Sequence, residues 1–285
     1  MQFEFAGALA VADGRYLARG GDSGGEESVL VVETLGAPAP PSRRRRRPRQ
    51  TEAGGAPATL PLARATAVRA FEPFGAEHDA AGWLDAATEA EETIDLLVAG
   101  GIALLNRALH AHATASADPH PQELSPERAV TVRIGYGSGG EVAAGRFAAA
   151  REVDVRASGG SRRRRRAEDL NPQERTAAIL GGRQRIDACE TLLLRARADL
   201  DAGRDREAAL QLRVGLEALL AELGGAVSDP GHDEDMETLY ERRGEAGEAA
   251  NSALRGELDA VAARNVRELV EICERVLRRR RVLRG

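Results

Sequence analysis

Hydrophobic residues in the second half of the chain recur every three or four positions, which is the spacing of one face of an α-helix. Asn171-Pro172 is typical of a helix start, Gly203 of a helix end and Asp205 of the next start. The acidic stretch DEDMETLYERR opens a further helix. We therefore expect an antiparallel helical bundle over residues 171–285. Its apolar stripes are Ile186, Cys189, Leu193, Ala196 and Leu200, then Ala209, Leu212, Leu216, Leu219 and Leu223, then Ala262, Val266, Leu269, Cys273 and Val276.

The first half instead alternates hydrophobic and polar residues, which is the period of a half-buried β-strand. Strands are expected at residues 27–35 (ESVLVVETL), 63–71 (ARATAVRAF) and 129–137 (AVTVRIGYG). Asp13-Gly14 lies between short apolar runs and predicts a β-hairpin. Residues 77–113 have helical spacing, and Gly100-Gly101 within them indicates a break or a close helix contact.

These patterns predict an α+β fold class: a small antiparallel sheet of β-hairpins with one long helical region, followed by an antiparallel helical bundle. We place an α+β domain at 1–157, an Arg-rich linker at 158–170 and the bundle at 171–285. Residues 36–62 are rich in proline, glycine and arginine, a composition that predicts a disordered insert in the first domain.

Two short stretches of the chain echo each other. VADGRYLA (11–18) and VAAGRFAA (142–149) share the pattern V-A-x-G-R-aromatic-x-A, and five arginines follow downstream of each. We favour a diverged duplication of a β-hairpin over coincidence in a biased composition. The duplication predicts that Ala144-Gly145 is a second hairpin tip.

Composition indicates a bacterial, cytoplasmic protein. The chain has no lysine among its 40 basic residues, and arginine, alanine, glycine and proline are encoded by GC-rich codons. Cys189 and Cys273 lie within apolar helical patterns, so we expect two buried thiols in a reducing compartment. The first residues lack the features of a signal peptide. The most apolar window, Ile94–Leu109, is interrupted by Asp95, Asn106 and Arg107, and we expect it to be too short and too polar to span a bilayer.

Three arginine clusters lie at 43–49, 162–166 and 278–284. The net charge is −5, and residues 161–285 contain 24 arginines against 24 acids, so no domain is basic as a whole. No aromatic residue near the first two clusters is available to stack on a base. We interpret them as solvated linker charges, with sequence-blind phosphate attraction as the alternative. The candidate polyanion contacts are Arg43, Arg44, Arg45, Arg46, Arg47, Arg162, Arg163, Arg164, Arg165 and Arg166.

The stretch GYGSGG (135–140) fits the dinucleotide fingerprint G-x-G-x-x-G and follows a predicted strand. In that hypothesis EVAAGRFAAAR is the helix at the pyrophosphate and Asp154 is the ribose acid. No alternating βαβ series surrounds the motif, so we favour a glycine-rich strand or bulge. A helix starting at Gly140 would support the nucleotide hypothesis, and a hairpin would oppose it.

Arg107 and His112 form a loose Arg-x4-His pattern that resembles the one in HEPN-type ribonucleases, whose pair acts on the scissile phosphate. The polar residue that usually follows the arginine is Ala108 here, and the pair lies outside the predicted bundle that such a family requires. His110, His112, Asp118 and His120 suggest a metal site only weakly, since residues at i and i+2 of a helix point apart. His232 is better interpreted as part of an acidic helix start.

We therefore assign no catalytic, cofactor or metal site. We expect a non-enzymatic protein-interaction or scaffold protein with a protein partner, no membrane association and no cofactor. A sequence-non-specific nucleic-acid-associated protein using its Arg-rich segments is the first alternative. A nucleotide-binding enzyme at GYGSGG, or an enzyme at Arg107 and His112, is the other.

Overall fold

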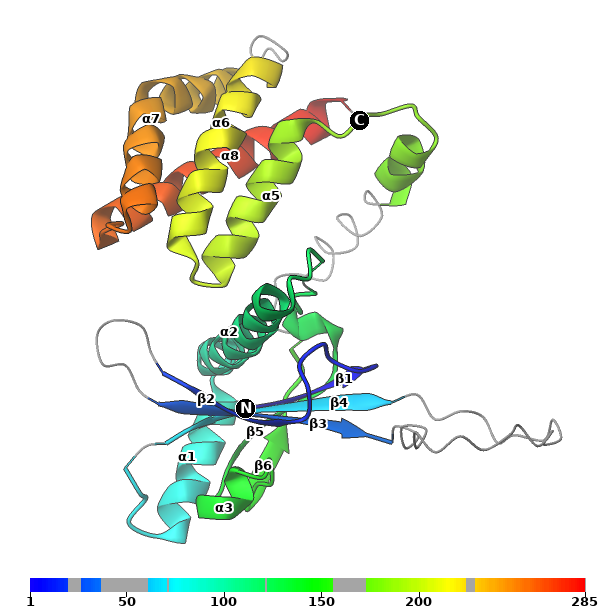
Figure 1. Ribbon diagram of the computed structural model, residues 1–285, viewed down its shortest axis with the longest axis vertical. Coiled ribbons are helices and arrows are strands. Elements are labelled where there is room, and N and C mark those ends of the chain that lie inside the picture. The colour runs from blue at the N-terminus through cyan, green and yellow to red at the C-terminus, as the bar shows by residue number, and fades with distance from the viewer. Residues whose placement is uncertain are drawn as a thin grey trace, which may run out of the picture. The chain divides into compact units, whose positions relative to one another are not determined.

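The computed structural model describes residues 1–19, 27–36, 61–70, 72–120, 122–155, 173–223 and 229–284. The chain forms two compact units, Met1–Gly160 (unit 1) and Ser161–Gly285 (unit 2). The fold class is α+β: unit 1 has an antiparallel sheet with helices, and the described elements of unit 2 are helices (Figure 1). Most of the predicted insert, residues 37–60, and all of the predicted linker, 158–170, lie outside the described residues.

Six antiparallel strands form the sheet of unit 1, in the spatial order β2-β3-β4-β1-β5-β6. The strands are β1 (Gln2–Ala6), β2 (Gly14–Ala18), β3 (Ser28–Leu35), β4 (Leu62–Arg69), β5 (Ala129–Tyr136) and β6 (Ala149–Glu152). The expected strands at 27–35, 63–71 and 129–137 are confirmed, because β-branched residues at alternate positions suit a pleated, half-buried surface.

The start of the chain lies in the middle of the sheet. Phe3 of β1 pairs with Ala65 of β4 and with Val132 of β5, so these three side chains share one face. Phe3 and Phe5 stack with their ring centroids 6.2 Å apart. Together with Leu30, Val32 and Ile134 of neighbouring strands, they form the core on which the helices pack.

The predicted hairpin at Asp13-Gly14 is wrong. β1 pairs with β4 and β5, whereas β2 pairs with β3, so the two segments that flank Asp13 do not meet. Asp13 instead accepts two hydrogen bonds from Thr34, from its backbone N–H at 3.0 Å and from its hydroxyl at 2.7 Å. The short apolar runs indicated strands correctly, but the apolar β1 is buried by two long-range partners and not by its neighbour in the sequence.

The helical region 77–113 consists of two helices, α1 (Glu77–Glu89) and α2 (Glu91–Ser116), separated at Ala90, which has an extended backbone. The break is therefore not at Gly100-Gly101. A Cβ atom on Gly101 would lie 2.9 Å from the Phe3 ring, and one on Gly100 would lie 2.9 Å from the Arg69 guanidinium. The alternative of a close contact is confirmed, because these glycines let α2 approach the sheet.

Helix α2 is longer than the apolar window of the sequence suggested. Its 26 residues reach Ser116, and within the described part of the chain it is the one helix with the length and apolar composition of a membrane span. The expectation of too short a segment was based on residues 94–109, and the helix that contains them is longer. In unit 1 one side of α2 packs in the core through Val98, Ile102, Leu105 and Leu109.

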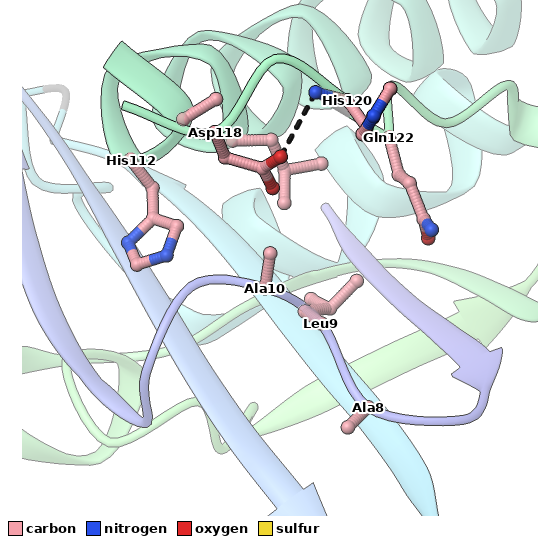
Figure 2. Close-up of a pocket in the computed structure, with 9 residues that line it drawn as sticks. Ala8, Leu9, Ala10, His112, Asp118, His120 and Gln122 are labelled. Atoms are coloured by element: carbon pink, nitrogen blue, oxygen red, sulfur yellow. Dashed lines mark hydrogen bonds between the residues drawn. The ribbon is translucent and has the colours of Figure 1, made fainter. Parts of the chain in front are cut away.

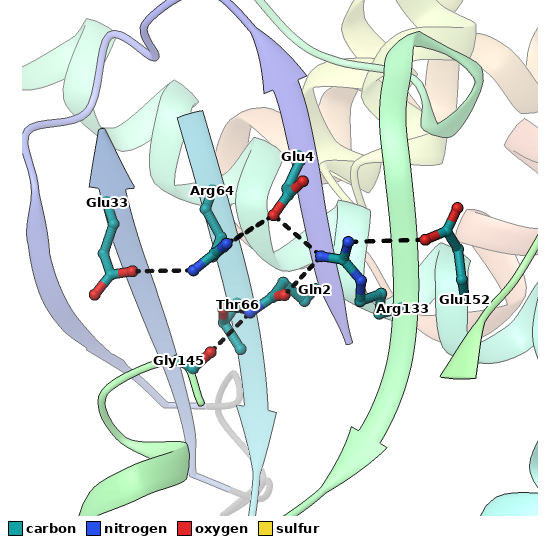
Figure 3. Close-up of polar contacts among 8 residues, drawn as sticks. All are labelled: Gln2, Glu4, Glu33, Arg64, Thr66, Arg133, Gly145 and Glu152. Carbon is teal, nitrogen blue, oxygen red and sulfur yellow. Dashed lines mark hydrogen bonds and ion pairs between the residues drawn. The ribbon is translucent and has the colours of Figure 1, made fainter. Parts of the chain in front are cut away.

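The opposite face of the sheet carries charges of alternating sign (Figure 3). Glu4 of β1 accepts hydrogen bonds from Arg64 of β4 at 2.9 Å and from Arg133 of β5 at 3.0 Å. Burial opposes ionisation of Glu4, but the bonds from both arginines outweigh it and lower its pKa. Glu33 of β3 lies 3.9 Å from Arg64, and Glu152 of β6 lies 3.7 Å from Arg133. Each charge thus has an opposite charge on the next strand.

Strands β5 and β6 form a hairpin, joined by residues 137–148, which include the short helix α3 (Gly139–Val142). In the two echoed stretches the conformations differ: Gly14 starts a strand, whereas Gly145 has a φ of 73° in a turn after α3. Ala144-Gly145 thus lies within the long connection of the β5–β6 hairpin but is not a two-residue tip. Gly145 lies on the charged face, where its carbonyl accepts a 2.7 Å hydrogen bond from Gln2.

Unit 2 is the predicted helical bundle. Its helices are a segment at 173–180, α5 (Ala188–Asp201), α6 (Asp205–Leu223), α7 (Pro230–Arg255) and α8 (Ala260–Arg284). Four of the five residues predicted for the first stripe are buried in α5, while Ile186 precedes the helix and is exposed. The α6 stripe and the α8 residues Val266, Leu269, Cys273 and Val276 are buried in one core. Gly203, with a φ of 71°, ends α5 as expected.

Candidate interaction surface

The three arginine clusters are not alike. Arg43–Arg47 and Arg162–Arg166 lie outside the described residues. The third cluster forms the last turns of α8, where cations are favoured by the helix dipole. Three of its guanidinium groups bind carboxylates within unit 2: Arg279 with Asp235 at 2.6 Å, Arg280 with Asp187 at 2.6 Å and Arg281 with Glu190 at 3.9 Å. These arginines therefore serve the bundle's own ion pairs.

Two of the four glycines of GYGSGG, Gly135 and Gly137, are explained by packing within the hairpin. A Cβ atom on Gly135 would lie 2.6 Å from the Ala149 carbonyl oxygen, and one on Gly137 would lie 2.4 Å from the Val142 side chain. The strand that follows the motif runs antiparallel to β5, and α3 has only four residues. A dinucleotide fingerprint needs a parallel βαβ unit with a full helix at the pyrophosphate, and the described residues here form a hairpin instead.

Arg107 and His112 both lie on α2, with exposed side chains. Five residues correspond to about 140° of rotation around a helix of 3.6 residues per turn, so the two side chains leave α2 in different directions. Hydrogen bonds beside them are local, such as the one from the Ser116 hydroxyl to the His112 carbonyl at 2.7 Å. The side chains of Arg107 and His112 therefore do not converge on one phosphate.

His112, Asp118 and His120 line a cavity of about 260 Å³ between the end of α2 and the loop after β1 (Figure 2). The His120 backbone N–H donates to Asp118 Oδ1 at 2.9 Å, which closes a local turn. Much of the remaining lining is small and apolar, with Ala8, Leu9, Ala10, Leu109 and Ala113. Within the described ranges no group of three or more His, Cys, Asp or Glu side chains is arranged to hold a metal ion.

His232 lies in the first turn of α7, as the acidic helix start predicted. The helix begins at Pro230, and Asp229 caps it by accepting the His232 backbone N–H at 3.0 Å. The ring is buried, and its Nδ1 has no hydrogen-bond partner among the described residues. Nearby Asp235 is paired with Arg275 and Arg279.

One part of unit 1 carries acids that mostly have no such pairing among the described residues. Residues 72–96 contain eight acids and no arginine, and all eight are exposed. The other 37 acids of the chain face 40 arginines, so the negative net charge resides here. Asp85 pairs with Arg151 of β6, and Asp79 lies 3.0 Å from His78 Nε2. We call this set the acidic surface; it consists of Glu72, Glu77, Asp79, Asp85, Glu89, Glu91, Glu92 and Asp95.

Three aromatic side chains gather beside the acidic surface. Phe74, in the loop before α1, lies with its ring centroid 6.0 Å from Trp83 of α1 and 6.3 Å from Tyr136 of β5. Phe74 is 45% exposed, and the other two rings are partly buried against the core. Asp79 accepts the Ala76 backbone N–H at 3.0 Å, which holds the loop that carries Phe74 against the first turn of α1. We call Phe74, Trp83 and Tyr136 the aromatic cluster.

Neither feature was predicted from the sequence. The aromatic cluster joins residues from a loop, a helix and a strand up to 62 positions apart, and no local pattern connects them. The acidic surface had a readable signal, since a 25-residue stretch without arginine is unusual in a chain with 40 arginines.

No protein-family model, no curated protein and no solved structure matches the chain.

Proposed function

We propose that the chain is a non-enzymatic protein-interaction or scaffold protein that binds a protein partner through unit 1, at the acidic surface and the aromatic cluster. The observation that carries this proposal is the position of the half-exposed Phe74 ring beside eight exposed carboxylates. Among the described residues only two of these carboxylates lie close to a basic side chain, Asp85 to Arg151 and Asp79 to His78. The composition of the chain supports the further expectation of a bacterial, cytoplasmic protein. The two buried free thiols, Cys189 and Cys273, are consistent with it.

Aromatic residues are enriched at protein interfaces because a rigid ring buries a large area at low entropic cost. An excess of one charge sign around the ring steers an oppositely charged partner and excludes like-charged ones. The same negative charge repels nucleic acid from this side of unit 1. Three arginines of the α8 cluster that could attract it, Arg279 to Arg281, are bound by Asp235, Asp187 and Glu190. These contacts favour a protein partner over a polyanion.

A differential capture experiment tests the proposal. The full chain is compared with the triple variant Glu89→Gln, Glu92→Gln, Asp95→Asn and with Phe74→Ser as baits in lysate of the native host. The matched control is Glu237→Gln, Glu241→Gln, Glu248→Gln, which removes three exposed acids from α7. We expect a protein retained by the wild type and the control but lost from both unit 1 variants. Retention by all four baits would contradict the proposal.

A further inference from the structure

We propose that the segment that binds at the acidic surface and aromatic cluster is an arginine-rich peptide segment. This inference rests on the proposed function and names the chemistry of the partner. The one basic side chain of residues 72–96 is His78, whose Nε2 lies 3.0 Å from Asp79, so the counterions for the other seven carboxylates come from outside the segment. Arg151 of β6 supplies one of them, to Asp85.

The dimensions of α1 suit a short extended peptide. Its 13 residues span about 20 Å, and five to six extended residues cover a similar length. Buried Ala80, Leu84 and Ala87 fix the inner side of the helix against the core, which leaves Glu77, Asp85 and Glu89 in solvent. A row of guanidinium groups along this helix would meet carboxylates from both its ends and from the first turn of α2.

The aromatic cluster distinguishes arginine from lysine. A guanidinium group is planar and weakly hydrated, so it stacks on an aromatic face while its N–H groups bind a carboxylate in a fork. Phe74 exposes nearly half of its surface within the same loop and helix turn as Glu72, Glu77 and Asp79. An ammonium group on a flexible stem makes the point-charge contact but not the stacked one. The site should therefore prefer arginine over lysine at equal charge.

A peptide titration tests the inference directly. The probe is labelled SRRRRRAED, the sequence of residues 161–169, with SKKKKKAED and SQQQQQAED for comparison. The protein is the full chain with Arg43–Arg47 and Arg162–Arg166 changed to glutamine, so that its own arginines do not compete for the probe. Binding is followed at physiological salt by anisotropy of the label and by emission of Trp83, the single tryptophan of the chain.

We expect the arginine peptide to bind saturably and to change Trp83 emission. The affinity for the lysine peptide should be lower by at least roughly threefold, and the glutamine peptide should not bind. The triple variant Glu89→Gln, Glu92→Gln, Asp95→Asn should weaken the arginine peptide by about tenfold. The α7 control triple should leave its affinity unchanged. Phe74→Leu should remove the preference for arginine over lysine while the charge-dependent binding persists.

Equal affinity for the arginine and lysine peptides, equal binding to all variants, or no binding at physiological salt overturns the inference. Submicromolar binding of labelled duplex DNA to the wild-type chain, unaffected by the unit 1 triple variant, also overturns it, in favour of a polyanion. If the peptides fail but capture still depends on the acidic surface, the proposed function stands with a partner of other chemistry. If both fail, the surface itself is wrongly assigned.

Discussion

Units 1 and 2 use charge in opposite ways. In unit 2, arginines and acids face each other between helices: Arg197 lies 2.8 Å from Glu274, and Asp235 binds both Arg275 and Arg279. In unit 1, pairing of this kind is found on one face of the sheet, around Glu4. Among the described residues, the acids of α1 and the start of α2 have one arginine partner, Arg151, and one histidine neighbour, His78. The role of a run of like charges can therefore be inferred only when its counterions are known, and these lie elsewhere in the sequence.

Each unit also has its own intrinsic probe, which makes the comparison measurable. Trp83, the single tryptophan, reports on unit 1, and the two cysteines, both fully buried, report on unit 2. Trp83 emission and thiol reactivity followed in the same urea titration separate the unfolding of the two units without dividing the chain.

Leu193→Ala should have the largest effect and should affect unit 2 alone. Leu193 of α5 is 1% exposed and packs against Gly215 of α6, so its truncation leaves a cavity costing about 2–5 kcal/mol. The thiol transition should move to lower urea while the Trp83 transition stays in place. Leu194→Ala, at the neighbouring 65% exposed position, is the control and should change stability by less than about 0.5 kcal/mol. Similar losses for both variants would disprove the assigned helix face.

Alkaline pH should destabilise unit 2 through its thiols. Burial raises the pKa of Cys189 to about 12, aided by a hydrogen bond and negative charge from Glu222, and burial with the charge of Cys189 raises that of Cys273 to about 12. The folded state keeps both protons above the unfolded pKa of 9.0, so stability falls as pH rises. The loss by pH 10 should be roughly 2–3 kcal/mol by circular dichroism. In the double variant Cys189→Ala, Cys273→Ala this decline should vanish. An unchanged decline would show that groups other than the two thiols cause it.

Gly101→Ala should act on unit 1 and not on unit 2. The added Cβ would lie 2.9 Å from the Phe3 ring, so α2 must move off the sheet, at a cost of about 1–3 kcal/mol. The Trp83 transition should shift and the thiol transition should not. Gly82→Ala on α1, where the new Cβ meets nothing within 4 Å, should instead stabilise unit 1 by about 0.5–1 kcal/mol. The same sign for both substitutions would show that the contact with Phe3 does not limit the approach of α2.

Removing one acid from each unit tests the charge comparison itself. Asp235→Asn leaves Arg275 and Arg279 without their shared carboxylate at a buried position, and should cost about 1–2 kcal/mol on the thiol transition. Glu89→Gln, in the last turn of α1, removes an exposed negative charge from the negative end of a helix dipole. It should leave the Trp83 transition unchanged or raise stability by a few tenths of a kcal/mol. Comparable losses in both units would refute the comparison.

Predictions from the sequence were most accurate where the structure depends on residues close together in the sequence. Gly203, the α6 stripe and the buried residues of α8 follow from a three-four spacing that any helix must bury on one side. Strands β3, β4 and β5 follow from alternation in the same way. The misplaced hairpin at Asp13-Gly14 and the break at Ala90 instead of Gly100-Gly101 have a common cause, because both depend on which distant segment packs against them. Gly101 tolerates no side chain because of Phe3, 98 positions earlier.

The sequence by itself determined the α+β class, the helical character of unit 2, the burial of Cys189 and Cys273, and the local excess of acid in residues 72–96. These depend on composition and on periods shorter than ten residues. Only the tertiary structure decided that β1 is central in the sheet and that Phe74, Trp83 and Tyr136 meet. It also decided that Arg279 to Arg281 are bound by acids of α5, of α7 and of the residue before α5. Such contacts join segments tens of residues apart, and they are fixed by competition among all apolar and charged surfaces to be buried or paired at once.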